Sequence, residues 1–224
     1  MDFSFFSKYS SLFIEGTSVT VIISLVALVF GCIMGMLICL MKLSTFKVLR
    51  AIATTYIEIL RGTPLFVQIY IIYFGFPQIG IDFPSIFGIS SDFISGAFAL
   101  SINSGAYVAE ILRSGIQSVD NGQMEASRSL GLGYASTMRH VIIPQAIKNI
   151  LPSLANEFIT LVKESAIISV IGVREIMFTA SIVKNKTFKP LEPLIVAAII
   201  YFVLTFTLSK LVGKFEKKLA KANA

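Results

Sequence analysis

The chain is 224 residues long, with 55% hydrophobic and 14% charged residues. Charged residues make up about a quarter of a typical soluble domain, so this composition excludes an ordinary soluble domain and indicates a membrane protein. Lys and Arg number 19 against 13 Asp and Glu, a formal net charge of +6. Because the basic residues flank apolar runs and do not form one patch, we attribute them to membrane orientation and expect no nucleic-acid partner.

The first two apolar segments predict membrane spans, since about 20 apolar residues cross a bilayer core as a helix. The first, roughly Thr17–Met41, exceeds the apolar part of a signal peptide, and no small-residue cleavage site follows it. We therefore expect it to be retained. The second is roughly Thr63–Phe76, extended backward by the segment TTYIEILR. Pro64 is expected to kink this helix and to free the carbonyl of Leu60.

Three further segments complete the predicted spans, at roughly Phe93–Leu112, Leu151–Gly172 and Leu194–Val212. The fourth span is the most polar, because it contains Glu157, Lys163 and Glu164. The sequence therefore predicts an all-α membrane protein of about five transmembrane helices, forming a single domain over residues 1–224.

The distribution of Lys and Arg predicts the orientation. Basic residues gather in the connections 42–50 and 113–150 and in the C-terminal tail, which five spans place on one side of the membrane. The positive-inside rule makes that side cytoplasmic, so the N-terminus and the loop 77–92 are expected outside. The loop 173–193 opposes this assignment, because it contains four basic residues, namely Arg174, Lys184, Lys186 and Lys189.

The connection at about 113–150 is the longest one on the cytoplasmic side, and it shows signs of an ordered helix. Asp120 followed by Gln123 resembles a capping box that starts a short helix near Gly122. Gly131 and Gly133 are able to end that helix by adopting positive φ.

The surface of this short helix allows two interpretations. Ala126 and Ser127 keep one side small, so that another protein's backbone can approach, and Pro144 is expected to start the next helix. From the residues alone, a docking helix and an amphipathic connector lying on the membrane surface remain equally open.

The same connection carries a motif that resembles a known family. Glu125-Ala126-Ser127, Gly131 and Val141-Ile142-Ile143-Pro144 match, in type and spacing, the cytoplasmic loop motif of the membrane subunits of ATP-binding-cassette (ABC) importers. Four further segments resemble the polar amino acid uptake branch of that family: FIEGTSVTVIIS (13–24), EILRGTPLFVQ (58–68), GAYVAEILRSGIQSV (105–119) and LVKESAIISVIG (161–172).

This resemblance implies a function and a set of partners. The short helix would be the coupling helix, seated in a cleft of a cytoplasmic ABC ATPase dimer. Two permease subunits, as a homodimer or with a paralogue, would form the pathway, and an extracytoplasmic substrate-binding protein would deliver a small amino acid. The protein would lie in a bacterial cytoplasmic membrane, in contact with lipid, with its N-terminus outside and its C-terminus cytoplasmic. The implied ATPase-coupling residues are Glu125, Ala126, Ser127, Gly131 and Pro144.

The chain itself is not expected to be an enzyme. It contains no phosphate-binding loop of the form G-x-x-x-x-G-K-[ST], so ATP hydrolysis is expected on a partner subunit and no cofactor on this chain. No metal or nucleophile site is apparent, and His140, the single histidine, is expected at the surface beside Arg139.

Polar residues within the spans are the candidates for substrate contact, because polar groups are costly in a membrane. Interhelical pairing is the alternative, and it is the expectation for Glu110, Glu157 and Arg61. The candidate substrate-binding residues are Asn103, Tyr107, Glu164, Ser165, Thr63 and Gln68.

These residues favour a particular substrate class. A carboxylate at Glu164 suits a transported ammonium or guanidinium, while Asn103 and Tyr107 suit the polar end common to all amino acids. The prediction is a polar amino acid, with a preference for arginine, lysine or histidine. The alternatives are glutamine or another polar amino acid, or a secondary transporter driven by an ion gradient, although five spans contain no visible inverted repeat.

Overall fold

A computed structural model describes residues 1–221, with side chains up to residue 217. Its regular structure is helical, apart from an isolated bridge between Ile86 and Ile89, and the predicted all-α class is confirmed. The elements are α1 (Phe5–Leu43), α2 (Lys47–Gly62), α3 (Leu65–Tyr70), η1 (Ile71–Gly75), α4 (Phe76–Gln78), α5 (Ser91–Gln117), α6 (Asn121–Ser129), α7 (Tyr134–Thr137), η2 (Met138–Ile142), α8 (Ile143–Glu164), η3 (Ser165–Ile171), α9 (Ile176–Thr187) and α10 (Glu192–Lys221).

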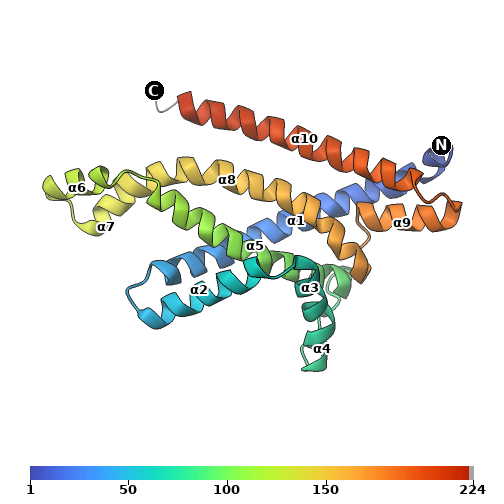
Figure 1. Ribbon diagram of the computed structural model, residues 1–224, viewed down its shortest axis with the longest axis horizontal. Helices are drawn as coiled ribbons and strands as arrows, with labels where there is room; N and C mark the ends of the chain where they lie inside the picture. Colours follow the sequence, from blue (N-terminus) through green and yellow to red (C-terminus); the bar gives the residue numbers. More distant parts are fainter. Residues whose placement is uncertain (222–224) are drawn as a thin grey trace.

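The long helices form an elongated bundle. Figure 1 shows α1, α5, α8 and α10 running along its long axis, with the α1–α2 turn and α6 at one end and the N-terminus and α9 at the other. α1 and α10 are each long and apolar enough to cross a membrane. Two bent pairs pass the same test: α2 with Leu65–Gln78, and the stretch Tyr134–Ile171 with α9.

α5 is too polar to pass that test alone, and its position in the bundle explains why. It packs against α1, α2, α3 and α8, and about half of its residues are buried. A polar helix is tolerated in a membrane when its polar face is turned to neighbouring helices. The helices that correspond to the five predicted spans therefore occur in the predicted order: α1, then α2 with α3, then α5, then α8 with η3, and finally α10.

The second span differs from the prediction in its shape. Thr63 and Pro64 are extended between α2 and α3, and the two helical segments meet at 108°, far more than a kink. Proline disfavours the helical conformation for the residue before it, so the break at Thr63 follows from Pro64. Figure 1 shows α3 and α4 projecting from the side of the bundle.

The segment 173–193 is not the plain loop that the sequence predicted, because it contains α9. Glu175 starts this helix, since its carboxylate accepts hydrogen bonds from the backbone N–H groups of Met177 and Phe178 at 2.8 and 2.6 Å. The hydroxyl of Tyr201 on α10 donates to the same carboxylate at 2.5 Å. Glu175 is fully buried, so this cap ties α9 to α10 in the bundle interior.

Lys189, in the connection from α9 to α10, also has a structural role. Its ammonium forms an ion pair with the Asp2 carboxylate and donates to the Asp2 carbonyl at 3.0 Å. It also lies over the Phe5 ring, 5.5 Å from the centroid. The N-terminal residues are therefore fastened to the start of α10.

Small residues set the spacing between α1 and α5. A β-carbon on Gly31 would lie 2.9 Å from Ser104, and one on Gly35 would lie 2.7 Å from Val108. The close packing that Gly31 and Gly35 indicated in the sequence is thus present, and it makes the α1–α5 contact the most extensive in the bundle.

Candidate functional site

α6, the predicted coupling helix, has a defined start and end. The Asp120 side chain accepts a hydrogen bond from the N–H of Gly122 at 2.7 Å, as an N-cap. The Gln123 side chain does not return the bond that a capping box requires, because its oxygen accepts from Gln145 of α8 at 3.4 Å. The helix start predicted at Asp120 is therefore confirmed, and the predicted capping box with Gln123 is wrong.

The end of α6 is a Schellman motif built on Gly131. This glycine has φ +86°, the N–H of Leu132 reaches the carbonyl of Ser127, and the N–H of Gly131 reaches that of Arg128. Gly133 has φ −67° and is the N-cap of α7, so the prediction that it also takes positive φ is wrong. One left-handed residue is sufficient to reverse the chain here.

The two faces of α6 have different surroundings. Glu125 and Ala126 are exposed, whereas Ser127 is buried against the protein's own chain and donates to the Gln123 carbonyl at 2.7 Å. Ala126 and Ser127 therefore do not share an open side, because consecutive helix positions differ by about 100°. Leu130, which no sequence motif singled out, is 84% exposed just after α6 and extends the free face with an apolar side chain.

The free face of α6 is supported from behind by η2 and α7. Pro144 is the second residue of α8, as predicted, and cannot donate a backbone hydrogen bond. Immediately before it, the N–H of Ile143 bonds to the carbonyl of Met138, five residues back, in a π-helical turn. α6 packs on this turn.

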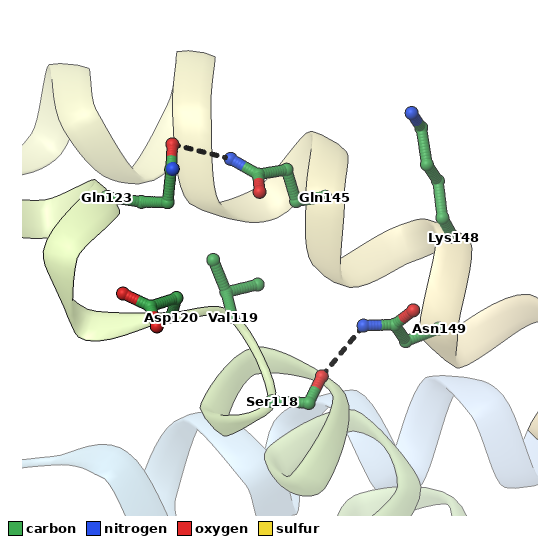
Figure 2. A pocket seen from close by; sticks show the side chains of 7 residues that line it. All are labelled: Ser118, Val119, Asp120, Gln123, Gln145, Lys148 and Asn149. Atoms are coloured by element: carbon green, nitrogen blue, oxygen red, sulfur yellow. Dashed lines mark hydrogen bonds between the residues drawn. The ribbon is translucent and has the colours of Figure 1, made fainter. Parts of the chain in front are cut away.

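A polar cavity of about 640 Å³ separates α6 from the end of α5 and from α8. Figure 2 shows its two cross-links: Asn149 donates to the Ser118 hydroxyl at 2.8 Å, and Gln145 donates to Gln123. These bonds join α8 to Ser118, just after α5, and to Gln123 in α6.

Three of the candidate substrate residues form one cluster in the bundle. The Gln68 amide donates to the Leu60 carbonyl at 2.8 Å and to the Thr63 hydroxyl at 2.9 Å. The Asn103 amide donates to the Gln68 side-chain oxygen at 2.9 Å. The Leu60 carbonyl that Pro64 was expected to free is thus held by side chains of the protein itself.

Tyr107 and Glu110 follow Asn103 along α5 and have other partners. The Arg61 guanidinium lies over the Tyr107 ring, 5.2 Å from its centroid, which is within cation–π range. Glu110 pairs with Lys42 at 2.5 Å and with Arg113 at 2.7 Å. Interhelical pairing, expected for Glu110 and Arg61, is therefore present.

Neither carboxylate of α8 forms an ion pair with the described residues. Glu157 is buried and accepts a hydrogen bond from Ser104 at 2.8 Å. Glu164, half-buried at the end of α8, has no hydrogen bond or ion pair with residues 1–217. Ser165 is fully buried, and its hydroxyl donates to the Val162 carbonyl at 2.8 Å. Contact between Ser165 and a substrate stays a prediction.

Known proteins resemble this chain over almost its whole length. Residues 17–221 match the family described as "Binding-protein-dependent transport system inner membrane component". The putative glutamine transport system permease protein GlnP of Rickettsia bellii is 45% identical, covering 96% of this chain and 95% of that one. The arginine transport system permease protein ArtQ of Bacillus subtilis is 42% identical, covering 100% and 99%.

Solved structures agree with these sequence matches. The crystal structure of an amino acid ABC transporter with histidines superposes with a TM-score of 0.91 at 50% identity, covering 97% of this chain and 99% of that one. An inward-facing MetNI methionine ABC transporter superposes with a TM-score of 0.78 at 16% identity, which shows the shared fold alone. By these matches the chain belongs to the family of binding-protein-dependent transport system inner membrane components, as an amino acid permease subunit of the ABC type.

Proposed function

We propose that this permease forms the translocation pathway of an ATP-driven amino acid importer and that α6 docks on the ATPase. The observation that carries this proposal is α6 itself, a polar helix capped at both ends, supported by η2 and α7, and exposed at one end of the bundle. Glu125, Ala126 and Leu130 form its free face. A rigid polar helix at the end of a membrane bundle suits a protein partner better than lipid.

The partners follow from this assignment. ATP is bound and hydrolysed by a pair of soluble ABC subunits, and this chain contributes no cofactor site. Two permease subunits form the pathway, and a binding protein delivers substrate at the end that carries the N-terminus and α9. That end is extracytoplasmic, and the α6 end is cytoplasmic. The family description names the dependence on a binding protein, and it does not favour the ion-gradient alternative.

The substrate is a polar amino acid, with a basic one preferred. Glu157 and Glu164 place two carboxylates on α8 that form no ion pair with the described residues, which favours a cargo with an ammonium or guanidinium group. The amides of Gln68 and Asn103 suit the α-amino and α-carboxyl groups of any amino acid. Glutamine is the second candidate, because this amide cluster is neutral and relatives of both names are similar to the chain.

Uptake into proteoliposomes with the ATPase and the binding protein tests the substrate. We expect ATP-dependent uptake of arginine, lysine or histidine, and a loss of preference for them over glutamine in Glu164→Gln. Glu58→Gln is the matched control, since Glu58 is an exposed carboxylate on α2. Uptake of glutamine alone by wild type, or unaltered selectivity in Glu164→Gln, would contradict the basic preference and leave Glu164 with a structural role.

Co-purification with the ATPase tests the docking assignment separately. Ala126→Trp places a large side chain on the free face of α6 and should abolish ATPase stimulation while the protein still inserts in the membrane. Ala51→Trp is the control, since Ala51 is exposed on α2 outside α6. Normal retention and stimulation of the ATPase by Ala126→Trp would show that α6 is not the docking helix.

A further inference from the structure

The sharp bend after α2 leaves part of the α1–α5 contact uncovered. α2 lies over this contact as far as Tyr56, whose hydroxyl donates to the Ile102 carbonyl at 2.6 Å and lies beside Gly105 and Met34. Beyond Gly62 the chain turns by 108°, and α3 leaves the direction of α2 while still packing against α5 (Figure 1). A groove of about 460 Å³ remains open between α1 and α5 on the far side of the bend from α2.

The apolar lining and the length of this groove fit the acyl chain of a lipid. Its walls are apolar, with Val26, Phe30 and Met34 from α1 facing Phe93, Ala97 and Phe98 from α5. The one hydroxyl in it, on Ser101, is used within α5, where it donates to the Ala97 carbonyl at 2.6 Å. Val26 to Met34 spans about 12 Å along the helix axis, against about 15 Å for one leaflet of the bilayer core.

A second cavity, of about 560 Å³, continues the groove toward the end of the bundle opposite α6. The two share Val26, Ile89 and Phe93 as lining residues. The second cavity lies at the membrane boundary, since two of its lining residues, Phe93 and Gly172, are ends of spans predicted from the sequence. It is therefore at the level of lipid headgroups.

This second cavity contains one positive and one negative group. Arg174 is exposed on its wall and has no hydrogen bond or ion pair with the described residues. Asp92 is half-buried, with one carboxylate oxygen accepting from Tyr73 at 2.8 Å and the other beside Gly172. Arg174 and Asp92 form no ion pair with each other, so the cavity presents both charges to a ligand.

We propose that the groove and the cavity together form a binding site for one phospholipid whose headgroup carries an amine, as phosphatidylethanolamine does. The phosphate pairs with Arg174, the ammonium approaches Asp92, and an acyl chain lies between α1 and α5. Guanidinium groups bind phosphate with charge-assisted hydrogen bonds, which selects the phosphate for Arg174. The Asp92 carboxylate repels a headgroup of net negative charge, so phosphatidylglycerol fits less well.

The continuity of the two cavities separates this ligand from the transported amino acid. A free amino acid matches the two charges but has nothing to fill an apolar groove of leaflet length. A phospholipid matches both parts at once. The bound lipid seals the contact that the bend after α2 leaves open.

Native mass spectrometry of the permease–ATPase complex, titrated with phosphatidylethanolamine and with phosphatidylglycerol, tests the site. We expect one tightly bound phosphatidylethanolamine per permease chain and weaker binding of phosphatidylglycerol. Arg174→Gln should lower phosphatidylethanolamine affinity by about tenfold, the size of one lost charge-assisted hydrogen bond. Val26→Trp fills the junction of groove and cavity and should prevent binding.

Two matched variants provide the controls. Lys186→Gln removes a positive charge at an exposed position of α9, at the same end of the molecule. Val29→Trp enlarges a half-exposed side chain of α1 that lies outside the groove. Both should bind lipid as wild type does.

Three results would overturn the proposal. Equal binding of the two lipids, or unchanged affinity in Arg174→Gln, would remove the headgroup assignment. Displacement of the lipid by free arginine or glutamine would assign the cavity to the cargo. Separation of the two permease copies in Val26→Trp, with lipid retained, would assign the groove to a protein contact.

Discussion

Substituting alanine for Gly35 should force α1 away from α5. The added β-carbon would lie 2.7 Å from two side-chain carbons of Val108 and 3.0 Å from the backbone nitrogen of Ala109. Carbon atoms normally approach to about 3.5–4.0 Å. The atoms in the way are close to or within the α5 backbone, so a rotamer change cannot relieve the contact and the helix axes must separate.

The size of the effect is a balance of two terms. Overpacking a close helix contact costs about 1–3 kcal/mol, while alanine gains about 1 kcal/mol over glycine in a helix interior. Gly35→Ala should therefore lower the free energy of unfolding by up to about 2 kcal/mol. Gly31→Ala should behave alike, since its β-carbon would lie 2.9 Å from Ser104. The double variant should cost less than the sum, because one separation of the helices accommodates both methyl groups.

Unfolding of the purified complex in detergent, by heat and by SDS titration, measures this prediction. Gly213→Ala on α10 is the matched control, because nothing lies within 4 Å of its added β-carbon and it should be neutral or slightly stabilising. Gly31→Ala should in addition lower uptake, since it displaces Ser104 from Glu157. A Gly35→Ala protein as stable as Gly213→Ala would refute the close contact.

Three other substitutions test the site and the termini. Gly131→Ala should weaken ATPase stimulation in a coupled ATPase assay, because a left-handed alanine at φ +86° costs about 1 kcal/mol or more; full stimulation would show that the turn tolerates a β-carbon. Asn103→Leu should destabilise the protein by about 1–3 kcal/mol in SDS titration by removing the bond to Gln68, and an unchanged midpoint would contradict the cluster. The Lys189 hydrogen bond holds the pKa of Asp2 well below its usual value, so the N-terminal contact is present above the ordinary carboxyl pKa and is lost only as pH falls through the lowered one. Amide hydrogen exchange of the first residues, corrected for the intrinsic rate, should therefore be independent of pH near neutrality. In Asp2→Asn this exchange should be faster than in wild type at pH 7. Equal exchange rates in the two proteins would contradict the ion pair.

Local features of the structure were predictable from the sequence. The start of α6 at Asp120, its end at Gly131 and the start of α8 near Pro144 each depend on residues within one turn of the boundary. Caps, left-handed glycines and proline act over a few residues, so sequence is sufficient to find them. Hydropathy likewise predicts the most apolar spans, α1 and α10, whereas the more polar α5 is tolerated through its neighbours.

Contacts between distant residues were not predictable in this way. Pro64 predicted a break in the helix. The 108° turn and the hydrogen bonds to the Leu60 carbonyl depend in addition on Gln68 and on Asn103, which lies 43 residues beyond Leu60. α9 was missed because glutamate is not a preferred N-cap residue, and the Glu175 carboxylate that serves as the cap also depends on the Tyr201 hydroxyl of α10. Hydropathy and local propensity are properties of short segments, whereas the partner of a buried polar group is chosen by packing, which exists only once the helices have come together.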